Sequence, residues 1–279
     1  MSGNLSACTI IVGGISIYVA KKSFKFLFLH KLTDLMEQLI PYFTFPVNIL
    51  CAFIWALVCY FSWKNSRTSA IVRFFLSPSA TISSISIFLI SCMWIGLSGD
   101  RTFVHSIFFV AVLLHLQTVL LFVLFRGWKD INGKVRLRFV LNHAGLLLAL
   151  GAAFWGNPDN EQLRMKLETD QISREAYRMD GSSTWLKDEI QLVDLDCQTY
   201  ENGAPMQYSA DIKVGETLVE LKVNHPYSSG LGDNIYLTSV GDGHCVLEIV
   251  HEPWKYFALA GIIMMIAGAF LLFFKGPLS

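Results

Sequence analysis

Three histidines lie within or at the edge of apolar stretches of the chain: His105, His115 and His143. An ionisable side chain inside a membrane is costly and is therefore a candidate for function. A neutral imidazole is a good axial ligand for haem iron, and a helix that buries one can hold a porphyrin. The same side chain can instead hydrogen-bond to a neighbouring helix. Both interpretations stay open, and ligation is favoured more at His143 than at the other two.

The other reactive side chains form no recognisable catalytic or metal-binding pattern. His225, His244 and His251 lack the spacing of a zinc site, which indicates structural roles. Cys197 and Cys245 are either a disulfide pair or two separate strand cysteines, and spacing does not decide between them. The chain contains no Cys-x-x-Cys, Walker loop, His-Glu-x-x-His or nucleophile elbow. These absences argue against a thioredoxin, a c-type cytochrome, a hydrolase or an ATPase.

Small residues follow His143 at helical spacing. They form one narrow stripe of a single helix face, which comprises Gly145, Ala149, Ala152 and Gly156. Gly261 and Gly268, seven residues apart, suggest a second stripe near the C-terminus. Small residues let membrane helices approach closely, so each stripe predicts a packed neighbour. His143, two residues from Gly145, points roughly opposite the stripe, toward a different neighbour or a cofactor.

The elements that would position these residues are membrane helices. The chain is 53% hydrophobic and only 16% charged, and its mean hydropathy is +0.46. Five apolar runs are long enough to cross a bilayer, at 40–63, 74–99, 102–125, 139–158 and 256–274. Pro41 and Pro46 fall at the start of their run, where a helix tolerates them. A sixth stretch, 7–20, is either a short span or an interfacial segment.

Charge divides the chain into two compartments. Residues 157–254 carry 18 Asp and Glu against 7 Lys and Arg, a net charge of −11, although the whole chain is neutral. No single basic domain exists, so no nucleic-acid partner is expected. The loops 64–73 and 126–138 are rich in Lys and Arg, which predicts that both face the cytoplasm. Residues 157–254 would then lie outside the cell membrane.

Between the last two runs, strand-like alternation replaces continuous apolar sequence. Residues 193–198 and 219–223 alternate apolar with polar side chains, and 241–243 predicts a hairpin between 235–240 and 245–250. We therefore predict an integral membrane protein, an α-helical bundle of five or six transmembrane helices with a small extracytoplasmic antiparallel β domain before the last helix. The expected divisions are an N-terminal segment 1–39, a four-helix bundle 40–158, the β domain 159–254 and the last helix with its tail 255–279.

The order of these parts resembles the ResB-like cytochrome c biogenesis family over roughly residues 40–274. The segment Phe139-Val-Leu-Asn-His143-Ala-Gly-Leu is similar to that family's helix before the outer domain, which typically begins with His-x-Gly-Leu. Leu186 to Asp196 and Tyr208 to Val214 resemble its paired strands. Val223-Asn-His-Pro-Tyr227, then Ile235-Tyr-Leu-Thr-Ser239, then Pro253-Trp254 complete the order.

The resemblance implies a CcsB-type subunit of the type II cytochrome c maturation system, non-catalytic by itself. Such a subunit would lie in the bacterial inner membrane with its β domain in the periplasm. Its partners would be a CcsA-type membrane subunit and apocytochrome c, to which the complex attaches haem. The implied cofactor is transient b-type haem, with His143 as the iron ligand. His105-Ser106 resembles another family His-Ser pair at a helix start, which makes His105 a second haem-binding candidate.

A different class of function also fits the residues. In this alternative the protein is a membrane-anchored scaffold or sensor whose acidic β domain binds an exported protein, and every histidine is structural. A transporter is disfavoured, because the spans carry almost no intramembrane charge to hold an ion or a solute.

Overall fold

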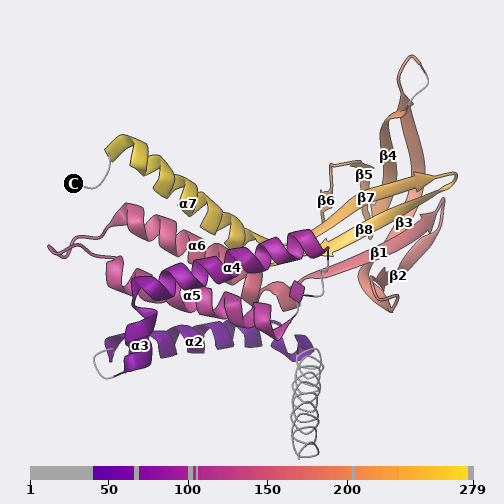
Figure 1. The fold of residues 1–279 in the computed structure, drawn as a ribbon. Helices are drawn as coiled ribbons and strands as arrows, with labels where there is room; N and C mark the ends of the chain where they lie inside the picture. The colour runs from indigo at the N-terminus through magenta and orange to yellow at the C-terminus, as the bar shows by residue number, and fades with distance from the viewer. Residues whose placement is uncertain are drawn as a thin grey trace, which may run out of the picture. The chain divides into compact units, whose positions relative to one another are not determined.

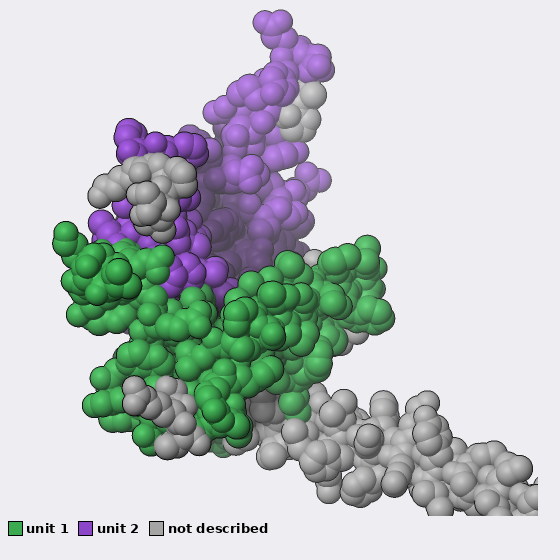
Figure 2. All heavy atoms as spheres, turned by 60° about the vertical axis from the view of Figure 1, so that its left-hand side comes forward, with its two compact units in different colours: residues 1–136 green, residues 137–279 purple. Residues whose placement is uncertain are grey.

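The computed structural model describes residues 40–65, 69–99, 103–104, 106–202, 205–230 and 232–275. The sixth apolar stretch at 7–20 lies outside the described residues. By internal contacts the chain forms two compact units, residues 1–136 and 137–279 (Figure 2). The predicted divisions at 158 and 254 refer to the membrane surface, not to compactness, and stay a prediction.

The first unit is helical. It contains the short turn η1 (Ile40–Phe43) and helices α2 (Val47–Lys64), α3 (Ala70–Phe75), α4 (Pro78–Ser98) and α5 (Ile107–Gly127) (Figure 1). Helix α5 packs against both α2 and α4. Serine side chains cap three of these helices by accepting N–H bonds, at Ser69, Ser77 and Ser106.

The first unit differs from the sequence expectation at one place. The apolar run predicted at 74–99 is divided, because α3 ends at Phe75 and α4 begins afresh at Pro78. Ser77 accepts the N–H of Ala80 at 3.2 Å, and Pro78 occupies the first turn, where its missing N–H costs nothing. Pro46 likewise precedes α2 instead of interrupting it, as expected.

The second unit begins with α6 (Leu137–Trp155) and ends with α7 (Lys255–Lys275). Together with α2, α4 and α5 these make five described helices that are long and apolar enough to cross a membrane. This number confirms the five predicted spans. The chain is therefore a multi-pass membrane protein.

Between α6 and α7 the chain forms the turn η3 (Asn157–Asp159) and an eight-stranded antiparallel sheet, which confirms the predicted β domain. Its strands are β1 (Glu161–Glu168), β2 (Ile172–Arg178), β3 (Ser183–Thr199), β4 (Pro205–Val214), β5 (Thr217–Lys222), β6 (Tyr227–Ser228), β7 (Asp233–Gly241) and β8 (His244–His251). The strand order is β5-β4-β3-β2-β1-β8-β7-β6. The predicted hairpin about 241–243 is β7–β8.

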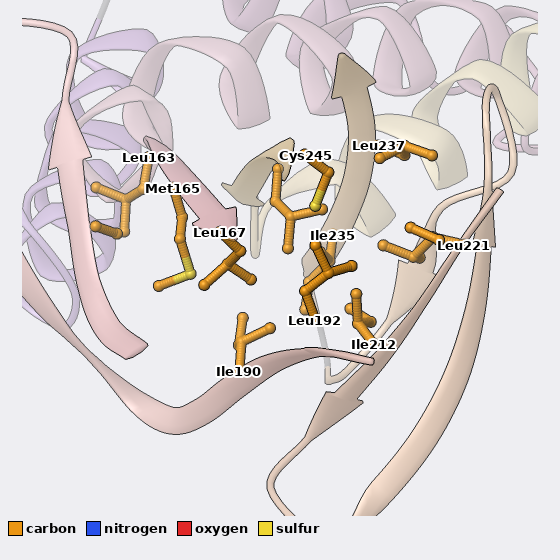
Figure 3. Packing of buried hydrophobic residues seen from close by; sticks show 13 residues of the cluster. Leu163, Met165, Leu167, Ile190, Leu192, Ile212, Leu221, Ile235, Leu237 and Cys245 are labelled. Carbon is orange, nitrogen blue, oxygen red and sulfur yellow. The ribbon is translucent and has the colours of Figure 1, made fainter. Parts of the chain in front are cut away.

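Aliphatic side chains from one face of this sheet form its core (Figure 3). In β1, Leu163, Met165 and Leu167 are buried while the residues between them are exposed, as strand alternation requires. Leu192, Ile212 and Leu247 from three other strands are fully buried in the same cluster. Among the described residues the core cluster is made of strand residues alone, and its burial removes apolar surface from water.

The sheet is joined to α6 and α7 through two adjacent inner strands. Strand β1 follows α6, β8 precedes α7, and the two pair antiparallel with Glu161 opposite His251. The indole N–H of Trp254 donates to Asp159 Oδ2 at 2.5 Å, which joins the start of α7 to the end of α6. The end of α6 and the start of α7 therefore lie next to each other, and the whole sheet is inserted between them.

Candidate functional site

The site region begins with the contact between α6 and α7, which we call the glycine seam. It consists of five small residues on the facing sides of the two helices, namely Gly145, Ala149, Gly156, Gly261 and Gly268. A Cβ atom added to Gly145 would lie 2.6 Å from the carbonyl oxygen of Gly261. A Cβ on Gly261 would lie 2.5 Å from the carbonyl oxygen of Gly145. The backbones therefore touch, and the two predicted small-residue stripes pack against each other.

Larger side chains close the seam at both ends. Gly156 leaves room for the Trp254 side chain, which occupies the position that a Cβ would take. Gly268 leaves the same room for the amide of Asn142. The seam therefore fixes the rotation of α6 about its axis, and with it the direction of every other side chain on that helix.

His143 lies on the side of α6 away from the seam. It is two residues from Gly145, which at 3.6 residues per turn is about 200° around the helix. Its Nδ1 atom is 2.9 Å from the carbonyl oxygen of Phe139, one turn earlier. The imidazole also stacks on the Phe139 ring, with centroids 4.0 Å apart and an interplanar angle of 25°. His143 is half-buried.

These two contacts set the chemistry of the imidazole. A carbonyl oxygen can only accept a hydrogen bond, so Nδ1 carries the proton and donates it. In the neutral ring Nε2 then keeps its lone pair and is the atom able to bind a metal. A backbone carbonyl that orients a histidine through Nδ1 is a common feature of metal-ligating imidazoles. His143 is thus held in the tautomer that an axial ligand needs.

The other two membrane histidines differ from His143. The His115 ring on α5 lies against the Phe75 ring, with centroids 5.1 Å apart at 54°. His105 lies outside the described residues. Its neighbour Ser106 is described and caps α5 by accepting the Phe109 N–H at 3.2 Å. The ligand role of His105 stays a prediction.

The histidines of the β domain are held by local contacts. Nδ1 of His225 lies 3.3 Å from the Val223 carbonyl, and Nδ1 of His244 lies 3.2 Å from the Asp242 carbonyl. Nδ1 of His251 forms a close hydrogen bond with Oδ1 of Asp233. Across the described part of the chain, no three His, Cys, Asp or Glu side chains gather as a metal site would require. The structural roles expected for these histidines stay a prediction.

The two β-domain cysteines are free thiols in different surroundings. Cys245 is fully buried in the sheet core, and this burial raises the pKa of its thiol to about 11. Cys197 is exposed on β3. The disulfide that the sequence left open is therefore not formed.

Two contacts of the site region were not anticipated from the sequence. The stacking of Phe139 on His143 follows from their spacing of four residues, which places both rings on one helix face. The sequence alone could therefore have predicted this contact. The bond from Trp254 to Asp159 joins residues 95 positions apart, and no local pattern predicts it.

Residues 135–246 match the family model described as the ResB-like family. The matched segment comprises α6 with His143 and the sheet into β8. It covers somewhat less than half of the 279 residues, so it supports the resemblance drawn above without extending it to α2–α5 or α7.

Comparison with whole proteins gives less. No curated protein matches the chain. Among solved structures, the chain is similar to one titled "Cytochrome c Heme Lyase CcmF", with 10% sequence identity and a TM-score of 0.34. The similarity covers 66% of this chain and 33% of that protein, so this chain spans about a third of its length. A TM-score this low supports no inference about function.

Proposed function

We propose that this protein is a CcsB-type membrane subunit of a cytochrome c maturation complex. In it, His143 holds haem during passage across the membrane, and the β domain lies beside the exported apocytochrome. The partners are a CcsA-type membrane subunit and apocytochrome c. The observation that carries the proposal is the geometry of His143, within the segment that matches the ResB-like family.

The residues present include one histidine nitrogen that could bind the iron of a haem. The donor is the Nε2 atom of His143, because Nδ1 is bound to the Phe139 carbonyl. The Phe139 ring packs against one face of the His143 imidazole, and the imidazole lies away from the glycine seam. Contacts within α6 therefore set the position of the imidazole. Haem bound there would supply the iron and the vinyl groups that are joined to a cytochrome. The protein's own part is to orient the imidazole, with Nδ1 directed at the Phe139 carbonyl and Nε2 directed away from it.

The proposed topology follows from the charges at the helix ends. The described loop between α5 and α6 contains Lys129, Lys134 and Arg136, and we place it in the cytoplasm of a bacterial cell. His143 then lies in the second turn of α6, about 9 Å from the helix start at ~1.5 Å per residue. The acidic sheet lies in the periplasm, and haem would reach His143 from the cytoplasmic side.

The test is the absorption spectrum of the complex. The chain is co-expressed with a CcsA-type subunit, and the purified complex is compared with the variants His143→Ala and Leu147→Ala. Leu147 is the matched control, since it follows His143 by one turn of α6 and is also half-buried. We expect a Soret band in the parent and in Leu147→Ala, and a weaker, shifted band in His143→Ala. Added imidazole should restore the parent spectrum of His143→Ala, because it replaces the missing ligand.

An unchanged spectrum in His143→Ala would remove the ligand role. If in addition no haem copurified with any variant, the scaffold alternative would explain the acidic sheet better. His105→Ala and His115→Ala, measured in parallel, show whether another histidine binds the iron instead.

A further inference from the structure

One part of the sheet is open on its side. Strand β3 pairs with β2 only up to Gln191, and a single bridge joins Leu192 to Thr169. Beyond that point β3 continues to Thr199 and pairs only with β4, so this hairpin extends past the neighbouring strands (Figure 1). We call residues 193–199 the open edge of β3. Within the described residues, no strand pairs with this edge.

The register shows which backbone groups the open edge presents. The Tyr208 carbonyl accepts the Val223 N–H at 3.3 Å on the β5 side, so Tyr208 turns away from β3. Cys197 lies opposite Tyr208. In an antiparallel pair of this kind both residues direct their N–H and C=O away from each other. The N–H and C=O of Cys197 therefore point out from the open edge.

Leu195, two residues earlier, faces the same way. Its N–H donates to the neighbouring carboxylate, Asp194 Oδ1, at 2.9 Å, while its carbonyl points outward. The open edge thus offers the Cys197 N–H as a donor and the carbonyls of Leu195 and Cys197 as acceptors, which are groups that an added strand can pair with. Natural sheets usually protect such edges with charged side chains, proline, a β-bulge or a covering loop. Residues 193–199 contain no lysine and no proline, but they carry Asp194 and Asp196 and begin at a register shift against β4.

Along the β3–β4 hairpin around this edge the charges are of one sign, and the nearest cation across the sheet is Lys222 on β5, which is paired with Glu220 at 3.0 Å. Between Lys187 and Lys213 the chain has no Lys or Arg and six acidic residues, Asp188, Glu189, Asp194, Asp196, Glu201 and Asp211. Of these, Glu189 is paired with Arg174 at 3.0 Å.

The acidic side chains are also stacked across strands. Asp194 lies opposite Asp211 on β4, and Asp211 lies opposite Glu220 on β5. Like charges directly opposite each other destabilise a sheet. This row ends at the open edge, where a cationic side chain on an added strand would relieve the repulsion.

We infer that the open edge of β3 is a docking site for an extended, lysine-bearing segment of an exported polypeptide, which binds by strand addition. Its backbone pairs with Leu195 and Cys197, and its lysines lie beside Asp194 and Asp196. This assignment rests on the proposed function and deepens it, because it names the part of the β domain that receives the unfolded polypeptide.

The probe is a blocked ten-residue peptide that alternates Lys with Val and Thr, added to the full-length protein in detergent micelles. Binding is followed by fluorescence anisotropy at low and high salt. Cys197→Pro removes the outward N–H without breaking a bond to β4, and proline is tolerated at such an edge. Cys197→Ser is its matched control. We expect about fivefold weaker binding in Cys197→Pro and parent affinity in Cys197→Ser, from the loss of one hydrogen bond.

Charge is tested separately. Asp194→Lys places a cation at the edge, and Glu216→Lys makes the same change of charge at the exposed turn between β4 and β5. We expect Asp194→Lys to weaken binding at least about tenfold and Glu216→Lys to have a much smaller effect. Equal effects of the two variants would reduce the interaction to general attraction by an acidic domain and overturn the docking site.

Register gives a second readout that does not depend on stability. Peptides with one activated cysteine, moved one position at a time, are offered to the exposed Cys197 thiol. Strand addition predicts disulfide trapping with a period of two residues, and trapping without such a period contradicts it. The haem spectrum is independent of this edge. A failed docking test with an intact His143-dependent spectrum therefore removes the docking site alone, while the reverse result removes the haem role alone.

Discussion

The glycine seam and the sheet core belong to one compact unit but are built from opposite kinds of residue. At the seam, Gly145 and Gly261 bring two backbones into contact. In the sheet core, the side chains of Leu192, Ile212 and Leu247 project from the hydrogen-bonded strands and are buried together in one cluster. The difference follows from the solvent. In lipid, apolar side chains gain nothing by leaving their surroundings, so close packing has to hold helices together, whereas in water burial of aliphatic surface does so.

The comparison has a consequence for function. A seam made of backbone contacts has few alternative arrangements, so it suits a helix that must present one imidazole in a fixed direction. The sheet core supports strands whose edges remain available, and the open edge of β3 is one of them. The proposed haem site at His143 therefore depends on the rigidity of the seam, and the proposed docking site depends on the exposed edge of β3.

The largest effect is expected in the sheet core. Leu247→Ala deletes a fully buried side chain of β8 and should reduce the free energy of unfolding by about 2–5 kcal/mol. Leu218→Ala is the control, since Leu218 on β5 is 65% exposed and should change it by less than about 0.5 kcal/mol. Thermal unfolding in detergent, followed by the circular dichroism of the sheet, measures both. Equal effects would mean that the sheet is not held by its apolar face.

A smaller loss of stability is expected at the glycine seam, where the destabilising change is the addition of an apolar side chain and not its removal. Gly145→Leu adds apolar surface but drives a side chain into the Gly261 backbone, which should cost about 1–3 kcal/mol. Gly96→Leu on α4 is the control, because a Cβ there meets nothing within 4 Å. Both variants are heated in the same detergent, and loss of helical signal is compared. If Gly145→Leu unfolds no earlier than Gly96→Leu, α6 and α7 are not in close contact in the membrane.

The sequence indicated much of this unit because its signals are local. Apolar runs predict spans, four-residue spacing predicts the seam, and the glycines at 241 and 243 predict the β7–β8 turn. In the first unit, by contrast, the six-residue helix α3 was not predicted, because its bounds depend on the Ser69 cap at its own start and the Ser77 cap at the start of α4. The pairing of β1 with β8 joins residues more than 75 positions apart and carries no local signal.

The candidate site was predictable in part for the same reason. His143 stands out because it is an ionisable residue in an apolar run, and its partner Phe139 lies one turn away. The open edge of β3 could not be read from the sequence, because it depends on where β2 stops pairing. Alternation predicted a strand at 193–198 but not which of its neighbours would be missing.

The smallest predicted effect is the dependence of the free energy of unfolding on pH, and it tests whether water reaches the sheet core. Burial raises the pKa of Cys245 from 9.0 to about 11, so the folded chain keeps the thiol neutral where the unfolded chain ionises it. The resulting stability is fully present below pH 9 and is lost as pH rises from 9 to 11. At pH 10 the loss should be about 1.4 kcal/mol, one pKa unit. Cys245→Val, similar in volume, should lack this component, so the difference between the two unfolding curves should appear only above pH 9. A parallel course up to pH 11 would mean that water reaches the Cys245 thiol, and the sheet core would then be wetter than the glycine seam.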